Sequence, residues 1–196
     1  MRGWSAALAS AYLIASVLLL GEHARAQSLQ DKIAACAACH GEKGISPNPD
    51  IPSIGGQPKL FVMYQLFFYR EGRRKNAEMN TIAKDMSDAE LTAISDYVAG
   101  LPAPEPAGGE VDEARYLRGA ALAQARICAS CHNPDYSGRE QMPRLAGQRE
   151  SYTLKALQDY RMGVRIGTQA AMAEAVRGLS DADFEDLAYF LARVRP

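Results

Sequence analysis

Two pentapeptides place cysteine and histidine at spacings that can attach a cofactor. Residues 36–40 read CAACH and residues 128–132 read CASCH, and together they use all four cysteines of the chain, Cys36, Cys39, Cys128 and Cys131. CxxCH is the signature of covalent haem c attachment, in which both thiols add to the vinyl groups of one porphyrin. The adjacent histidine, His40 or His132, can then coordinate the iron. The motifs therefore predict two covalently bound haem c groups.

Four cysteines have two other common uses, as a pair of disulfides or as a tetrathiolate zinc site. Zinc sites of that kind usually separate their CxxC pairs by about 15–20 residues, whereas Cys39 and Cys128 lie far apart in the sequence. Each pair is also followed directly by a histidine, which neither alternative requires. The pattern favours haem attachment over both.

The residues around these motifs predict helices that would position them. Residues 29–38 are expected to lead into the first motif as a helix, and a second helix is expected from Pro58 to Arg70. Ser87-Asp88-Ala89-Glu90 is a capping box that begins an amphipathic helix. The stretch between these helices, which contains Met79, is expected to be a loop. Residues 101–109, LPAPEPAGG, have no apolar period and predict a semi-rigid linker.

The second half of the chain repeats the first. Pro52 to Gln57 (PSIGGQ) returns as Pro143 to Gln148 (PRLAGQ), and the serine of the capping box returns as Ser180. No segment shows the alternation of a β-strand. The predicted fold is therefore all-α, with two tandem domains of similar fold related by an internal repeat. Their expected bounds are 27–100 and 110–196, joined by the linker at 101–109.

The second axial ligand of each haem can be inferred by elimination. Once a predicted signal peptide containing His23 is removed, only His40 and His132 remain as histidines, and the cysteines are committed to attachment. Methionine is the remaining soft donor. Among the seven methionines, only Met79 and Met172 occupy matching positions in the two halves. We therefore expect these two to ligate iron, and Met63 and Met86 to fill the core.

Further residues recur in both halves and are candidates for the haem surroundings. Pro52 and Pro143 follow their histidines closely enough for a proline carbonyl to accept the second imidazole N–H. The other recurring pairs are Gln57 and Gln148, Tyr69 and Tyr160, and Arg70 and Arg161. These side chains are expected either to reach a haem edge or propionate, or to serve helix-surface solvation or interdomain packing. The Arg73-Arg74-Lys75 run is expected to be a solvated loop, with a partner-docking patch as the alternative.

The N-terminus predicts export. A basic start, an apolar run over residues 6–20 and the sequence Ala24-Arg25-Ala26 form a signal peptide over residues 1–26, with cleavage after Ala26 and residence in the periplasm. The apolar run is shorter than the ~20 residues of a membrane span, and retention as an anchor is the alternative. A formal net charge of −1 without a basic stripe argues against nucleic-acid binding.

The chain resembles the dihaem cytochrome c4 family of class I c-type cytochromes. The resemblance rests on the double CxxCH, the P-x-[IL]-[AG]-G-Q loops, the Y-R-x-G helix ends and the M-x6-[LM]-S patterns, and covers residues 27–196. It implies two monohaem cytochrome c domains with histidine and methionine ligands, at His40 and Met79 and at His132 and Met172. Met86 departs from the leucine usual at its position and adds a second sulfur after Met79.

The resemblance also implies a function. Members are periplasmic electron carriers, some associated with the inner membrane, that deliver electrons towards a terminal oxidase. The expected function is therefore single-electron relay between a respiratory donor and a terminal oxidase or reductase, and not enzymatic catalysis. Two alternatives remain open: a dihaem redox enzyme of the peroxidase or thiosulfate-oxidising type, or a dedicated electron-accepting subunit of a dehydrogenase.

Overall fold

The computed structural model describes residues 29–165 and 170–196, and this part of the chain is helical. Its extended pairing is limited to an isolated bridge between Arg139 and Met142. A helix that ends at residue 40 comes first. It is followed by α2 (Lys59–Arg70), α3 (Ala77–Ala83), α4 (Asp88–Gly100), α5 (Glu113–Ala125), α6 (Ala129–His132), α7 (Glu150–Arg161), α8 (Ala170–Ala175) and α9 (Asp181–Arg193). The predicted signal peptide lies outside the described residues. No helix among those described is long and apolar enough to cross a membrane.

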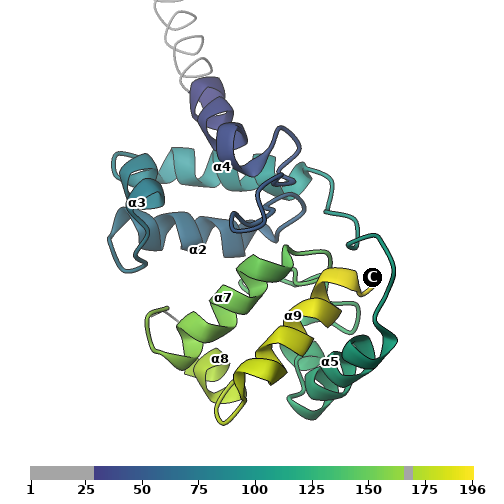
Figure 1. Cartoon of the computed structure of the whole chain (residues 1–196). Coiled ribbons are helices and arrows are strands. Elements are labelled where there is room, and N and C mark those ends of the chain that lie inside the picture. The colour runs from purple at the N-terminus through teal and green to yellow at the C-terminus, as the bar shows by residue number, and fades with distance from the viewer. Residues whose placement is uncertain (1–28, 166–169) are drawn as a thin grey trace, which may run out of the picture.

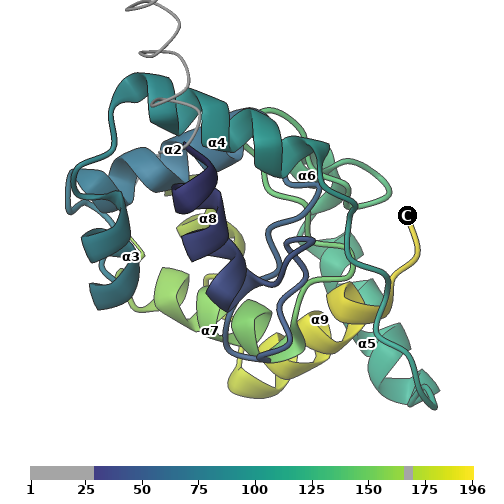
Figure 2. The same cartoon turned by 90° about the horizontal axis from the view of Figure 1, so that it is seen from above.

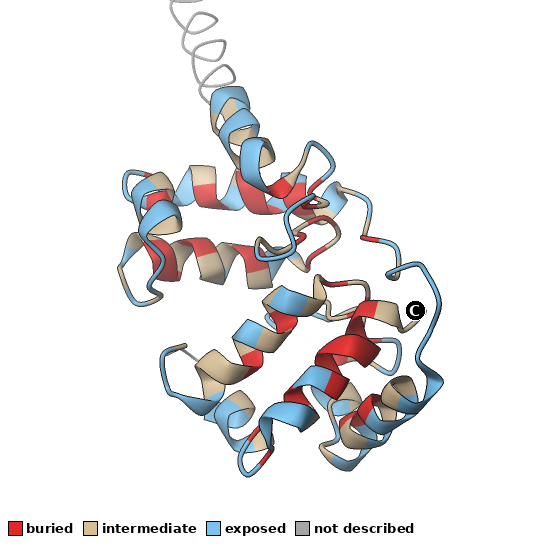
Figure 3. Ribbon diagram, viewed as in Figure 1, coloured by how far each residue is buried: buried red, intermediate tan, exposed pale blue. Residues whose placement is uncertain are grey.

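The helices form two bodies, each with its own core (Figure 1). In the first body α2 packs against α3 and α4, and in the second α9 packs against α5 and α7. The view from above shows α5 beside α9 (Figure 2). Buried residues line the facing sides of these helices (Figure 3). The first core contains Val62, Leu66, Leu91, Ile94 and Val98; the second contains Ala123, Leu157, Phe184, Leu187 and Phe190.

Local sequence signals set where the helices begin. Ser87 and Ser180 form the expected capping boxes of α4 and α9, each accepting from the backbone N–H three residues later. The helix 29–40 runs two residues beyond the predicted end and contains the whole first CxxCH motif. The loop expected around Met79 is instead α3, because the Asn76 side chain caps it by accepting from Met79 N–H at 2.9 Å. The prediction of a loop there was wrong.

The linker lies against glycines of both domains. A Cβ atom at Gly56 would lie 2.9 Å from Ala103 Cα, and one at Gly147 would lie 2.6 Å from Pro104 O. Gly147 also has a φ of +74°, which disfavours any side chain there. The far end of the linker is held by Ala107 N–H, which donates to Ala192 O at 2.7 Å. These contacts explain why both proline-containing repeat loops carry glycine before their glutamine.

Candidate functional site: two haem c centres

Each CxxCH histidine is held by a proline carbonyl of its own domain. The Nδ1 atom of His40 lies 2.8 Å from Pro52 O, and that of His132 lies 2.8 Å from Pro143 O. A carbonyl oxygen can only accept, so Nδ1 must carry the proton and donate it. The lone pair of each neutral imidazole is therefore on Nε2, the atom that can coordinate a metal.

Burial keeps both imidazoles neutral. Removal from water lowers the pKa of His40 and of His132, and the hydrogen bond to the proline carbonyl opposes this only in part. Nε2 of His132 is buried and has no hydrogen-bond partner. A buried polar atom without a partner is costly, and a bond to iron would satisfy it. The histidine environment thus fits a haem on the Nε2 side.

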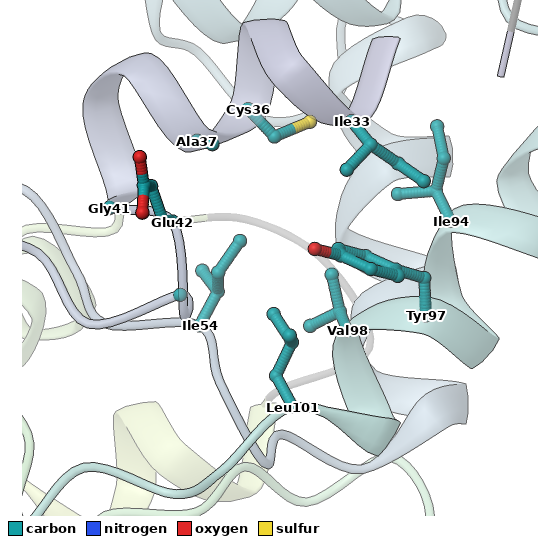
Figure 4. A pocket seen from close by; sticks show the side chains of 11 residues that line it. Ile33, Cys36, Ala37, Gly41, Glu42, Ile54, Ile94, Tyr97, Val98 and Leu101 are labelled. Carbon is teal, nitrogen blue, oxygen red and sulfur yellow. The ribbon is translucent and has the colours of Figure 1, made fainter. Parts of the chain in front are cut away.

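The four cysteines fit the same cofactor. None of the four forms a disulfide; Cys36 and Cys128 are half-buried, and Cys39 and Cys131 are exposed. Burial raises the pKa of the Cys36 and Cys128 thiols. Cys36 lines an apolar pocket together with Ile33, Ile54, Ile94, Tyr97, Val98 and Leu101 (Figure 4). No three His, Cys, Asp or Glu side chains converge into a metal cage within residues 29–165 and 170–196.

The two motifs differ in the backbone that precedes them. In the first domain one continuous helix carries residues 29–40. In the second, α5 ends at Ala125 and α6 begins at Ala129. Between them Ile127 has a φ of 55°, a left-handed conformation that is uncommon for a β-branched residue. The second haem motif is therefore presented by a short separate helix.

The two matched methionines lie on short helices at the edge of their cores. Met79 on α3 packs against the first core, and Met172 on α8 packs against the second; both are half-buried. Met86 is different, because it is only 4% exposed and forms part of the first core. Its counterpart Leu179 is buried in the second core. Met86 is thus a core residue, as expected.

Arg70 and Arg161 brace the last helix of their domains. Arg70 donates to Met86 O at 2.9 Å and to the Asp88 carboxylate at 2.8 Å. Arg161 donates in the same way to Leu179 O and to Asp181. Each guanidinium therefore ties the end of one helix to the start of another. The two arginines therefore make equivalent structural contacts in the two domains.

Gln57 and Gln148 meet the opposite domain. The amide of Gln57 donates to Arg144 O at 3.0 Å and accepts from Arg144 N–H at 2.9 Å. The amide of Gln148 donates to Ser53 O at 2.8 Å and accepts from Ser53 N–H at 2.9 Å. The amide groups of both glutamines therefore take part in interdomain packing, which was one of the roles expected for them. The sequence showed that the glutamines recur but carried no signal for their partners.

A cluster of arginine and tyrosine also joins the domains. Arg74 donates to the Tyr152 hydroxyl at 3.0 Å and lies over the Tyr69 ring, while Arg165 lies over the Tyr160 ring. Burial raises the pKa of Tyr69 to about 12. Burial also acts to raise the pKa of Tyr152, but the charges of Arg165 and Arg74 outweigh it and bring the value to about 7. Tyr152 could not be predicted from the repeat, because its counterpart in the first half is Phe61.

Comparisons with known proteins agree with this architecture. The family model described as "Cytochrome c" matches residues 116–195, and "Cytochrome C oxidase, cbb3-type, subunit III" matches residues 22–98. Cytochrome c4 of Pseudomonas aeruginosa is 32% identical, over 83% of this chain and 85% of that protein. The thiosulfate dehydrogenase electron acceptor of Thiomonas intermedia is 32% identical, over 81% and 78%. The crystal structure of reduced recombinant cytochrome c4 from Pseudomonas stutzeri superposes with a TM-score of 0.77 at 29% identity, covering 86% and 98% of the two chains.

Two helical domains with one CxxCH motif each define an electron-transfer cytochrome of the c type with two covalent haem c groups. The identity to known members extends over most of both chains. The chain belongs to the dihaem cytochrome c4 family.

Proposed function

We propose that this protein is a periplasmic carrier that relays single electrons between a respiratory donor and a terminal oxidase or reductase. Cys36 and Cys39 anchor the first haem and Cys128 and Cys131 the second. His40 with Met79, and His132 with Met172, are the axial ligands. The domains span 27–100 and 110–196, with the linker at 101–109.

The observation that carries this proposal is the repetition of one complete ligand set. Each domain holds a neutral imidazole through a hydrogen bond from Nδ1 to a proline carbonyl, which leaves the lone pair on Nε2. Each also places a half-buried thioether on a short helix beside its core. Haem bound in this way supplies one-electron redox chemistry, and a methionine ligand raises its potential. Two protein ligands on each iron leave no position for a substrate, which supports a carrier rather than an enzyme.

Methionine ligation can be tested by substitution. Met79→Leu and Met172→Leu should each abolish the methionine-to-iron charge-transfer band of one ferric haem, halving the band of the whole protein. Met86→Leu is the matched control, because Met86 lies in the core where the second domain has Leu179; it should leave the band intact. A halved band in Met86→Leu, or a band of full strength in Met79→Leu, would assign the first ligand differently.

A second candidate function is that of electron acceptor for a thiosulfate dehydrogenase, and similarity to the Thiomonas intermedia protein favours it. Thiosulfate added to the oxidised protein separates the possibilities. A carrier or an acceptor should stay oxidised with thiosulfate alone. When a dehydrogenase is then supplied, a dedicated acceptor should be reduced rapidly. Reduction by thiosulfate alone, or rapid carbon monoxide binding to one reduced haem, would instead indicate an enzyme.

Export can be tested by the mass of the purified protein. Cleavage after Ala26 with two haems attached defines one expected mass, and retention of residues 1–26 as an anchor defines another. The periplasmic fraction should contain the cleaved form. Recovery of the uncleaved form from the inner membrane would contradict cleavage after Ala26 and support retention as an anchor.

A further inference from the structure

The hydrogen bonds that the two glutamines make between the domains form two reciprocal pairs. Gln148 of the second domain bonds to both backbone groups of Ser53, and Gln57 of the first bonds to both backbone groups of Arg144. Ser53 and Arg144 are counterparts in the repeat, as are the two glutamines. The contact therefore has an approximate twofold symmetry, in which each domain gives one glutamine and receives one.

Each glutamine acts on the same peptide group that holds the opposite histidine. The N–H of Ser53 and the C=O of Pro52 belong to a single peptide bond. His40 Nδ1–H donates to that carbonyl at 2.8 Å, and the N–H at its other end donates to Gln148 Oε1 at 2.9 Å. The peptide bond between Pro143 and Arg144 links His132 to Gln57 in the same way.

Such a chain of hydrogen bonds transmits polarisation. The peptide unit is a resonance system, so donation from its N–H increases the negative charge on its oxygen. Hydrogen bonds in series strengthen each other, by roughly 10–30% per bond. A stronger acceptor for Nδ1–H makes the imidazole more basic and a better iron ligand. Hydrogen bonding around the ligand is one of the means by which a protein sets a haem potential, and a more basic imidazole favours the ferric state.

We propose that Gln148 and Gln57 are positioning residues for the axial histidine of the opposite domain, so that each domain lowers the reduction potential of the other domain's haem. This inference rests on the proposed ligand roles of His40 and His132. Contact between the domains then influences both reduction potentials as well as holding the domains together. Any partner that loosens the contact raises both potentials.

The two halves of the contact are not equal. Ser53 and Gln148 are both buried, whereas Arg144 is only half-buried. Hydrogen bonds are electrostatically stronger where water is excluded. The influence of Gln148 on the first haem should therefore exceed that of Gln57 on the second.

The test is a redox titration of the full holoprotein carrying Gln148→Leu or Gln57→Leu. Leucine fills a similar volume but neither accepts nor donates a hydrogen bond. The hyperfine-shifted haem methyl signals in NMR spectra distinguish the two haems, so that each potential can be assigned to its domain. Gln148→Leu should favour reduction of the first haem roughly threefold, which is about 28 mV at 59 mV per tenfold change. Gln57→Leu should raise the potential of the second haem by less. Gln148→Glu keeps an oxygen acceptor for Ser53 N–H and should show no such rise.

The decisive result is a crossed pattern, in which a substitution in one domain raises the potential of the haem in the other domain. Unchanged potentials, a rise in the haem of the substituted domain, or equal rises of both haems in both variants would each overturn the proposal. If Gln148→Leu fails to assemble, Gln57→Leu gives the same crossed test in the other direction. Failure of the ligand assignment would be visible separately, because the wild-type protein would then lack a histidine–methionine spectrum.

Discussion

At the scale of single residues, the two halves orient the histidine of the CxxCH motif with the same hydrogen bond. A carbonyl that can only accept fixes the proton of His40 or His132 on Nδ1. Proline suits that position because its own nitrogen cannot donate and its φ is fixed. The halves diverge one residue before the first cysteine of each motif. Ala35 is helical, whereas its counterpart Ile127 is left-handed.

Ile127→Asn should stabilise the protein. The left-handed conformation costs a β-branched side chain about 1 kcal/mol or more, and asparagine tolerates it far better. Ile127 is 69% exposed, so little apolar burial is lost. Denaturant unfolding of the holoprotein should show a gain of about 1 kcal/mol. Ala35→Asn, at the matching helical position, should instead lose about 0.5 kcal/mol; a gain in both variants would contradict the explanation by backbone strain.

At the scale of helices, capping side chains do more than begin the last helix of each domain. Glu90 accepts from the Ser87 N–H at 2.8 Å and completes the capping box of α4. It also pairs with Lys32 at 2.5 Å, which ties the haem-bearing helix 29–40 to α4. The hydrogen bond from Lys32, followed by those from Ser87, lowers the pKa of Glu90 from 4.5 to about 2. Asp183 occupies the equivalent place in α9.

Glu90→Gln should weaken the first domain in a pH-dependent way. Because the folded pKa is the lower one, the carboxylate stabilises the protein above pH 4.5, and this contribution disappears as the pH falls towards 2. The variant should be less stable at pH 7 by about 1 kcal/mol, the upper end for a partly exposed pair. Thermal unfolding at pH 7 and pH 3 should show the difference shrinking at the lower pH.

Asp183→Asn serves as the control for the lysine pair. The lowered pKa of Asp183 comes first from Ser180 and not from a lysine. Its substitution should therefore cost less at pH 7 than that of Glu90. Equal losses in the two variants would mean that Lys32 contributes nothing measurable.

At the scale of the whole molecule, two small cores are joined by polar contacts and a bound linker. The main helix-to-helix contacts lie within each half. Loops and side chains make the contact between them, including Phe61 N–H, which donates to Glu140 O at 2.9 Å. The arginine–tyrosine cluster adds Arg74 and Tyr152 to this interface. The relative position of the haems therefore depends on hydrogen bonds and charge rather than on a shared apolar core.

Tyr152→Phe should remove a pH-dependent part of the stability. The folded pKa of Tyr152 is about 7, against about 10 for an unfolded tyrosine. Between these values the unfolded state binds more protons, so wild-type stability should rise with pH across this range. The loss caused by Tyr152→Phe should grow from pH 7 to pH 9.5, reaching about 1 kcal/mol or more.

Tyr160→Phe is the matched control in the same cluster. Burial raises the pKa of Tyr160, so it stays protonated in both states below about pH 10. Its effect on denaturant unfolding should be constant from pH 7 to 9.5. A parallel pH trend in both variants would show that Tyr152 does not ionise selectively.

Much of the fold and the chemistry could be predicted from local patterns. The CxxCH motifs, the two capping boxes and the repeat are encoded within a few residues, and they led to the helices, the tandem domains and the two haems. The short helix α3 was missed because seven residues show too little periodicity to distinguish it from a loop. The partners of Arg70 and Arg161 also escaped prediction, since an exposed guanidinium has no preferred partner in sequence terms.

The sequence by itself therefore determined that the chain carries two haem c groups on its CxxCH cysteines, because covalent attachment depends on short-range spacing along the chain. Only the tertiary structure decided what the recurring glutamines, tyrosines and arginines do. Arg70 and Arg161 find their partners within their own domains, about 20 residues along the chain. The partners of the two glutamines lie in the opposite domain, up to 95 residues away along the chain. Such pairings arise when two independently packed cores bring their loops together, and no local pattern records the orientation in which they meet.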